Sequence, residues 1–184
     1  MSMAIFTPYG SVSAELIKRI SNIKLLLSDV DGVLSDGKIY ITNSGDEIKS
    51  FNTKDGFDIV AIQKTGVDFG IITGRQSNIV DIRMKSLKAK YICQGINDKI
   101  TALNEIMKKA NVSASETAYI GDDVIDIPVF KACGLSFCPA DAHPIVKASA
   151  DYICNLNGGE GAVREVCDLI LTARDKTDTL GASI

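Results

Sequence analysis

The segment IKLLLSDVDG, residues 23–32, is a continuous apolar run that ends abruptly in two aspartates and a glycine. A strand that is buried on both faces of a parallel sheet has this composition, because helices cover both of its faces. Asp29 and Asp31 therefore stand at the carboxyl end of a predicted central strand. Open α/β sheets bind their ligands beyond that end.

Strand and helix patterns alternate downstream of this segment. We expect strands at 67–73, 91–93, 117–120, 135–137 and 151–153, and helices at 11–20, 55–64, 77–87, 97–110, 126–132, 144–148 and 161–173. Residues 38–42 and 47–52 flank a turn-rich tetrad, which predicts a β-hairpin at about 37–52. The order predicts one α/β domain, residues 1–184, with a doubly wound parallel sheet and a flexible polar tail at about 174–184.

Composition narrows the class of protein. The chain has 184 residues, of which 46% are hydrophobic and 23% charged, as in one compact domain. Twenty basic residues against 23 acidic ones give no case for nucleic-acid binding. No export signal or membrane-spanning run is evident, and five cysteines without a CxxC pair favour reduced thiols in the cytoplasm. The expected partner is a small molecule.

A second group of carboxylates follows the predicted strand at 117–120. Asp122, Asp123 and Asp126 would meet Asp29 and Asp31 at the same sheet edge, and several acids there are costly unless a cation neutralises them. Oxygen ligands suit Mg²⁺. We expect Asp29, Asp122 and the Asp31 backbone carbonyl as ligands. The alternatives are a solvated turn for the pair and a helix cap for Asp123 or Asp126.

Two further residues suit a phosphate group. Thr73 ends a buried strand before Gly74, and Lys99 stands near the start of a predicted helix. Taken singly, a threonine there is usually a strand residue and a lysine a solvated side chain. Together with the aspartates they supply a nucleophile, an acid, a cation and two phosphate donors, which phosphoryl transfer requires.

These residues carry a family resemblance. Asp29-Val30-Asp31-Gly32-Val33-Leu34, Thr73, Lys99 and Gly121-Asp122-Asp123 with Asp126 resemble the four ordered motifs of the haloacid-dehalogenase-like phosphohydrolase superfamily. The flanks DVDGVLSDG (29–37), ITGR (72–75), ADAHP (140–144) and GGEGAVRE (158–165) are similar to those of its sugar-acid phosphatases. The likeness extends over about residues 9–184.

The resemblance implies a mechanism. Asp29 would attack phosphorus and become an aspartyl phosphate, while Asp31 protonates the leaving oxygen and later activates water. Mg²⁺ would offset charge between Asp29 and the phosphate, and Thr73 with Lys99 would hold the phosphate oxygens. The implied substrate is the 8-phosphate of an eight-carbon sugar acid on the route to lipopolysaccharide.

The resemblance also implies a set of substrate-binding residues. They are Asn52, Thr53, Lys54, Asp55, Gly56, Arg75 and Arg83. A guanidinium can bind the sugar carboxylate with two hydrogen bonds, although a solvated helix face is the alternative for Arg83. Lys54 stands where the resemblance leads us to expect Arg in many relatives, and Val60 stands where some relatives carry Arg. His143 is interpreted as a structural turn residue, and Arg164 as either a site residue or an exposed helix-start cation.

The chain has no room for an inserted cap domain. Ile39, Ile41, Ile48 and Phe51 of the hairpin would be poorly buried on one protomer, which favours packing between subunits. The resemblance implies a homotetramer in which a neighbour's hairpin and tail, here residues 179–184, help shape the pocket.

Three other functions are alternatives to an eight-carbon sugar-acid phosphatase. They are a nine-carbon sialic or deaminated sialic acid 9-phosphate phosphatase, a non-catalytic oligomerisation module and a receiver domain.

Overall fold

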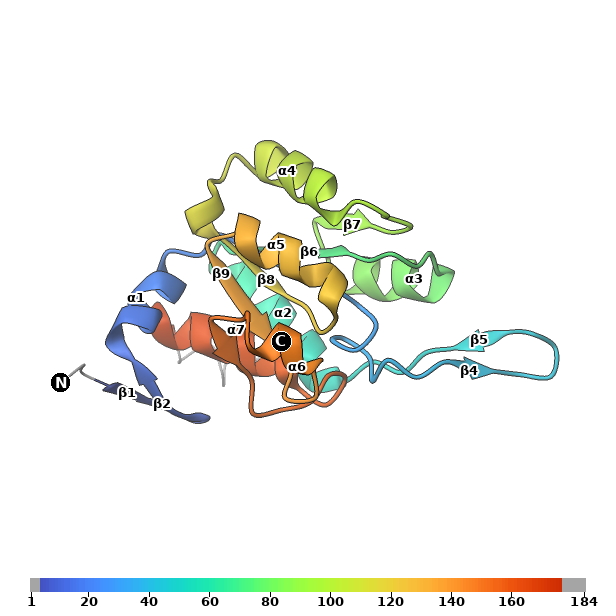
Figure 1. The fold of residues 1–184 in the computed structure, drawn as a ribbon, viewed down its shortest axis with the longest axis horizontal. Helices are drawn as coiled ribbons and strands as arrows, with labels where there is room; N and C mark the ends of the chain where they lie inside the picture. Colours follow the sequence, from blue (N-terminus) through green and yellow to red (C-terminus); the bar gives the residue numbers. More distant parts are fainter. Residues whose placement is uncertain (1–3, 177–184) are drawn as a thin grey trace.

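The computed structural model describes residues 4–176. Its centre is a six-stranded parallel sheet in the order β10-β9-β8-β3-β6-β7 (Figure 1). The strands are β3 (Leu25–Ser28), β6 (Asp68–Ile72), β7 (Tyr91–Cys93), β8 (Thr117–Ile120), β9 (Leu135–Cys138) and β10 (Tyr152–Ile153). The prediction of a doubly wound parallel sheet is therefore confirmed.

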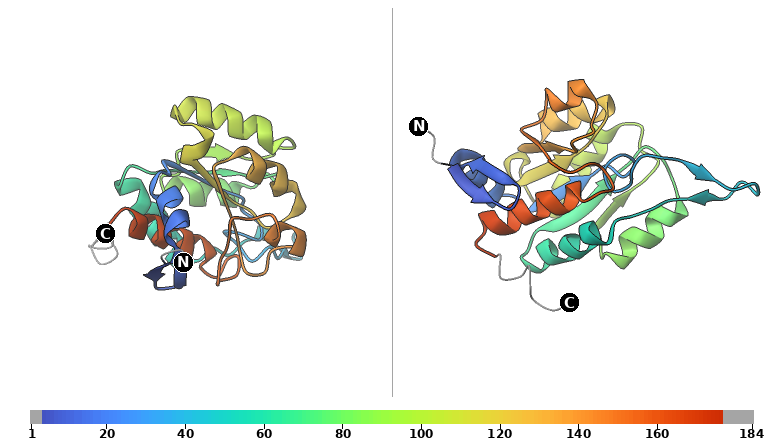
Figure 2. Two further views of the ribbon diagram at one scale, coloured as in Figure 1. Left: turned by 60° about the vertical axis from the view of Figure 1, so that its left-hand side comes forward. Right: turned by 90° about the horizontal axis from the view of Figure 1, so that it is seen from below.

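Helices cover both faces of this sheet (Figure 2). One face carries α1 (Ala14–Ser21), α2 (Thr53–Lys64), α3 (Asn78–Ser86) and α7 (Ala162–Ala173). The other carries α4 (Lys99–Ala110), α5 (Ile127–Ala132) and α6 (Pro144–Lys147). Strand β3 serves both cores, because Leu26 packs on the first face while Leu25 and Leu27 pack on the second. Two short 3₁₀ helices, η1 (Ala114–Glu116) and η2 (Val124–Asp126), flank β8.

The sheet topology gathers the functional strand ends. The chain leaves β3 for β6 and β7 on one side, then crosses back to β8, β9 and β10 on the other, so β3 lies at the switch point. In the strand register, Ser28 pairs with Ile71 of β6 and with Ile120 of β8. The residues that follow these three positions therefore emerge side by side at one edge.

Two hairpins lie outside the main sheet. The predicted one is β4 (Tyr40–Ile41) paired with β5 (Glu47–Ile48), which extends away from the body (Figure 1). Its strands are shorter than expected. The other, β1 (Ala4–Thr7) with β2 (Gly10–Ser13), was not predicted. The helix expected at 11–20 was therefore predicted to start too early, because residues 11–13 belong to β2. The helix begins at Ala14, where the Ser13 hydroxyl caps it by accepting the Leu16 N–H at 3.2 Å.

The two ends of the chain bear on the remaining predictions. Of the tail expected at 174–184, Arg174 is described, and its guanidinium donates to the carbonyls of Thr65 and Ile23. Residues 177–184, which include the segment expected to reach a neighbour, lie outside the described part of the chain. Within residues 4–176 no helix has the length and apolar character needed to cross a membrane.

Candidate active site

A buried lysine stands at the centre of the site. Lys99 is the first residue of α4. Asp98 caps the N-terminus of this helix, because its carboxylate accepts hydrogen bonds from the N–H groups of Ile100 and Thr101. The Lys99 ammonium lies 2.6 Å from Asp29 Oδ2 and 2.7 Å from Asp126 Oδ1. Lys99 and both aspartates are buried. An isolated buried charge would be strongly disfavoured, and here each charge has a partner of opposite sign. We refer to these three residues as the Asp29–Lys99–Asp126 array.

Titration in this array follows from burial and charge together. Burial lowers the pKa of Lys99, but the charges of Asp29 and Asp126 outweigh it, so its pKa is raised and it stays protonated. Burial raises the pKa of Asp29, and Lys99 partly offsets this while the Asp126 charge adds to it. A cation beside Asp29 would thus favour the ionised carboxylate.

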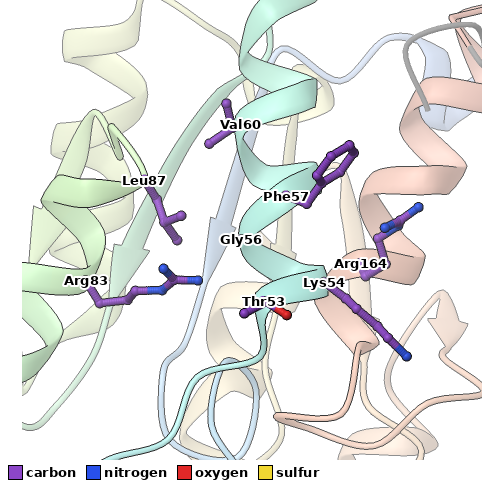
Figure 3. A pocket seen from close by; sticks show the side chains of 8 residues that line it. All are labelled: Thr53, Lys54, Gly56, Phe57, Val60, Arg83, Leu87 and Arg164. Carbon is purple, nitrogen blue, oxygen red and sulfur yellow. The ribbon is translucent and has the colours of Figure 1, made fainter. Parts of the chain in front are cut away.

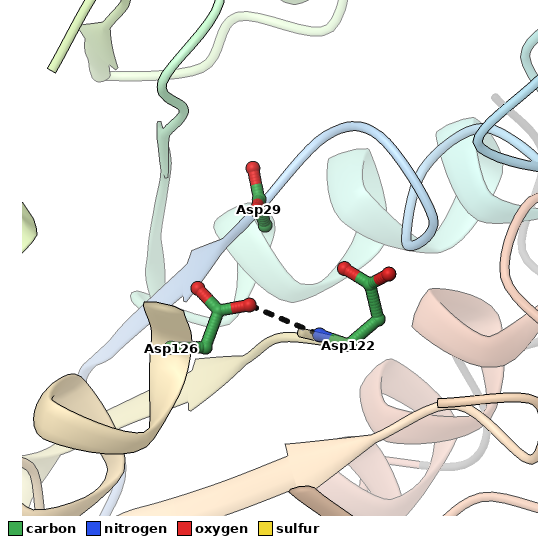
Figure 4. A group of neighbouring side chains, drawn as sticks. All are labelled: Asp29, Asp122 and Asp126. Atoms are coloured by element: carbon green, nitrogen blue, oxygen red, sulfur yellow. Dashed lines mark hydrogen bonds between the residues drawn. The ribbon is translucent and has the colours of Figure 1, made fainter. Parts of the chain in front are cut away.

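Three carboxylates converge beside Lys99. Figure 4 shows Asp29, Asp122 and Asp126 approaching from the ends of β3 and β8 and from η2. Oxygens of all three lie within 4.8 Å of one another. Asp126 is already used, because its Oδ2 accepts the N–H groups of Asp122 at 3.1 Å and Asp123 at 3.2 Å.

Asp122 is the carboxylate with capacity for a metal ion. Its side-chain oxygens accept no hydrogen bond from any residue in 4–176, and burial together with the charges of Asp29 and Asp126 raises its pKa to about 7. A Cβ at position 32 would collide with it, so Gly32 leaves room for this carboxylate. The Asp31 carbonyl likewise accepts no bond within the described residues. The residues present therefore fit the predicted set for Mg²⁺, an ion that takes hard oxygen ligands.

These groups open into one cavity of about 300 Å³. Asp29, Asp31, Thr73, Arg75 and Asp122 line it. The Thr73 hydroxyl forms no hydrogen bond within residues 4–176 although the residue is buried, which leaves it free to donate to a phosphate. Predicted residues from the ends of β3, β6 and β8 thus meet in this cavity. Lys99 lines a neighbouring cavity and is connected to the first through its ion pair with Asp29.

The other predicted substrate-binding residues lie elsewhere. Thr53, Lys54, Gly56 and Arg83 line a second cavity of about 490 Å³, which shares no lining residue with the first. In Figure 3 the Arg83 guanidinium points from α3 towards the first turn of α2. It forms no ion pair with any described residue, and its Nε is buried without a partner.

Asn52 and Asp55 hold the chain beside this second cavity. Asn52 caps α2 by accepting the Lys54 N–H at 2.9 Å, and its amide donates to the Gly159 carbonyl at 3.3 Å. Asp55 is buried and accepts the backbone N–H of Arg164 at 2.7 Å. Substrate binding by this group stays a prediction, because one protomer does not bring it to the catalytic cavity.

Two structural alternatives are confirmed. Asp123 caps η2 by accepting the Val124 N–H at 2.7 Å, and His143 caps α6 by accepting the Ile145 N–H at 3.2 Å. Sequence reasoning missed Tyr119, whose hydroxyl donates to Asp126 Oδ1 at 2.8 Å and accepts from Lys99 at 3.2 Å. Only its position in β8, two residues before Gly121, could have indicated this role.

Comparison with known proteins agrees with this geometry. The family model of the haloacid dehalogenase-like hydrolases matches residues 91–166, which carry the Lys99 and Asp122 motifs. The aspartates that follow β3 and β8, the Thr73 hydroxyl that follows β6 and the Lys99 ammonium at the start of α4 form the arrangement that the resemblance to this class of hydrolase predicts.

Relatives of nearly full length define the family within that class. The chain is 45% identical over 175 residues, 95% of its length and 93% of the relative's, to the 3-deoxy-D-manno-octulosonate 8-phosphate phosphatase of Escherichia coli strain K12. The crystal structure of that phosphatase from Yersinia pestis matches with a TM-score of 0.95 at 45% identity, covering 97% of this chain and 96% of the other.

A third relative was solved with ligands. The Moraxella catarrhalis phosphatase, in complex with magnesium ion, phosphate ion and KDO, matches with a TM-score of 0.87 at 42% identity, covering 90% of this chain and 95% of the other. The chain belongs to the 3-deoxy-D-manno-octulosonate 8-phosphate phosphatase family.

Proposed function

We propose that this protein is a Mg²⁺-dependent phosphatase that converts 3-deoxy-D-manno-octulosonate 8-phosphate to 3-deoxy-D-manno-octulosonate and phosphate, in lipopolysaccharide biosynthesis. The observation that carries the proposal is the buried Asp29–Lys99–Asp126 array beside the Asp122 carboxylate, which has no hydrogen-bond partner among residues 4–176. Such an array supplies a nucleophile and bound charge at one point, as phosphoryl transfer requires. The proposed substrate is taken from the relatives of the same family, which are phosphatases of 3-deoxy-D-manno-octulosonate 8-phosphate.

The roles of the residues follow from their places in the cavity. Asp29 attacks phosphorus and forms an aspartyl phosphate, while Asp31 gives a proton to the leaving sugar oxygen and then takes one from the attacking water. Thr73 and Lys99 bind phosphate oxygens, and Lys99 also keeps Asp29 oriented. Mg²⁺ held by Asp29, Asp122 and the Asp31 carbonyl would neutralise charge that develops on the phosphoryl group.

We also propose that the working form is a homotetramer. Ile39, Ile41 and Ile48 are more than half exposed on the protruding hairpin, and such apolar side chains favour an interface between subunits. Phe51, which was expected to share this exposure, instead packs against the core at the base of the hairpin.

The cytoplasm is the proposed location. All five cysteines are free thiols, three of them buried, as is usual in a reducing compartment. A sugar-acid phosphate is highly charged and does not cross a bilayer unaided, so the proposal places the protein in the compartment where such a substrate is made.

The test is phosphate release by the purified protein against a panel of phosphorylated sugars. The panel contains the octulosonate 8-phosphate, nonulosonate 9-phosphates, and hexose and pentose phosphates, each with Mg²⁺ and with EDTA. Mg²⁺-dependent preference for the eight-carbon acid, lost in Asp29→Asn, is the expected result. Preference for a nine-carbon acid would transfer the same mechanism to the alternative substrate. No turnover of any phosphate would favour a non-catalytic oligomerisation module.

A further inference from the structure

The second strand of the hairpin contacts two residues that line the catalytic cavity. Glu47 and Lys49 are two residues apart on β5 and its extension, so their side chains leave the same face of the strand. Glu47 Oε1 accepts a hydrogen bond from the Arg75 guanidinium at 2.8 Å, and the Lys49 ammonium donates to Asp31 Oδ1. Ile48, between them, points the opposite way and is 56% exposed.

Lys49 is unusually buried for a hairpin lysine. Its side chain is 3% exposed, whereas the side chain of Lys38, at the start of the same hairpin, is 71% exposed. Burial of an ammonium requires a partner of opposite charge, and here the partners are Asp31 and, at 3.9 Å, Glu47. These contacts place the Lys49 ammonium against Asp31, which lines the catalytic cavity.

The hydrogen bond from Lys49 makes the two carboxylate oxygens of Asp31 different. Oδ1 accepts from Lys49 and, at 3.4 Å, from the Ser35 hydroxyl. Oδ2 has no hydrogen-bond partner among residues 4–176, and Asp31 lines the catalytic cavity. One oxygen is thus fixed by the protein while the other is left for the substrate.

We propose that Lys49 is a positioning residue for the reaction: it holds Oδ1 of Asp31 so that Oδ2 faces the leaving oxygen. The inference rests on the proposed function, which makes Asp31 the acid and base. In the first step the Oδ2 proton moves to the sugar oxygen as its bond to phosphorus breaks and the Asp29 bond forms. In the second, Oδ2 takes a proton from the water that attacks phosphorus, and Asp29 leaves. Lys49 keeps its protons throughout.

The experiment compares an alkyl with an aryl phosphate. Release of a sugar alkoxide needs a positioned acid, whereas p-nitrophenolate leaves without one, and kcat/KM reports the steps up to formation of the aspartyl phosphate. Lys49→Met is expected to lower kcat/KM for the octulosonate 8-phosphate about 10- to 100-fold, through kcat, with KM within about threefold of wild type. For p-nitrophenyl phosphate the loss is expected to stay below about threefold.

Matched variants separate positioning from other roles. Lys49→Arg, which keeps a cationic donor, is expected to recover most of the lost kcat, and Lys38→Met, on the same hairpin, to behave as wild type. Thermal melting and gel filtration check that folding and assembly are unchanged. If Lys49→Met does not fold, Lys49→Gln takes its place, and failure of both would make the residue structural and overturn the proposal.

Several outcomes would contradict the inference. An equal loss on both substrates, a rise in KM alone, or no recovery by Lys49→Arg would each show that Lys49 does not act through the acid. If the wild type prefers another sugar phosphate, the comparison uses that substrate and the proposed substrate alone fails. If the wild type hydrolyses no phosphate monoester, the proposed function fails and this inference with it.

Discussion

Replacement of Asp58 by asparagine should stabilise this protein at neutral and alkaline pH. Asp58, on α2, is fully buried against Asp168 of α7, and both carboxylates face the single Arg164 guanidinium, at 2.7 and 2.8 Å. Asp168 also accepts the Tyr9 hydroxyl at 2.6 Å, so it is the better satisfied of the two. Burial, and then the neighbouring Asp168, raise the pKa of Asp58 to about 8.

The sign follows from linkage. A carboxyl whose folded pKa is about 8, against an ordinary value of 3.8, binds its proton more tightly in the folded state. Its favourable contribution is complete below pH 3.8 and is lost as the pH rises through 8. At about 1.4 kcal/mol per pH unit, roughly 4 kcal/mol is lost by pH 7. Because the amide introduced by Asp58→Asn would still need partners, we expect the variant to gain about 2–4 kcal/mol at pH 7 and almost nothing at about pH 4.

The assay is urea unfolding followed by circular dichroism at about pH 4 and pH 7, at one protein concentration because any assembly would contribute to stability. Subtracting the free energy of unfolding of the wild type from that of the variant cancels the contributions of the other titrating groups. Asp168→Asn is the matched control, and it should destabilise because it weakens the bonds to Tyr9 and Arg164. A gain that is the same at both pH values, or a loss at the higher one, would refute the assignment of a strained, protonated Asp58.

Three further predictions concern the catalytic cavity. Asp122→Asn should abolish detectable Mg²⁺ binding in calorimetry, because the proposed site loses a charged ligand; unchanged affinity would exclude Asp122 as a ligand. Gly32→Ala should weaken Mg²⁺ binding and lower stability by about 1–2 kcal/mol in urea unfolding, since its Cβ meets Asp122 and its φ is +81°; full retention would contradict the close approach. Tyr119→Phe should cost about 1 kcal/mol, because its hydroxyl joins Lys99 to Asp126; a melting temperature equal to wild type would contradict this.

Much of the fold could be predicted because its signals are local. The buried run before Asp29 and the alternation that follows it predicted the strands at 91–93 and 117–120 with their observed bounds. The β1–β2 hairpin escaped prediction because four-residue strands without apolar alternation carry almost no periodic signal. The strands of the second hairpin are only two residues long. At the tip they end where the Thr42–Asp46 backbone bond closes a tight turn, and away from the tip residues 38–39 and 49–52 do not take part in strand pairing.

The site was predictable to the extent that it follows from strand ends. Asp29, Thr73 and Asp122 each come after a strand of one parallel sheet, so topology alone brings them together. Tyr119 and Asp58 could not be found in this way, because each lies within a helix or strand where a buried polar group is indistinguishable from an ordinary surface or core residue. Lys49 was missed because a lysine on a hairpin is usually solvated.

The alternation of exposed and buried side chains at Ile48 and Lys49 relates the proposed subunit interface to the catalytic cavity. The exposed Ile48 ends β5 and the buried Lys49 follows it, so a subunit that covered Ile48 would fix the segment that presents Lys49 to Asp31. The protomer by itself brings together the groups proposed for phosphoryl transfer, while the Arg83 guanidinium lies in a separate cavity without an ion-pair partner among the described residues. In the proposed tetramer, neighbouring subunits would take the place of a cap domain: they would complete recognition of the sugar acid and, through the hairpin, hold the acid that releases it.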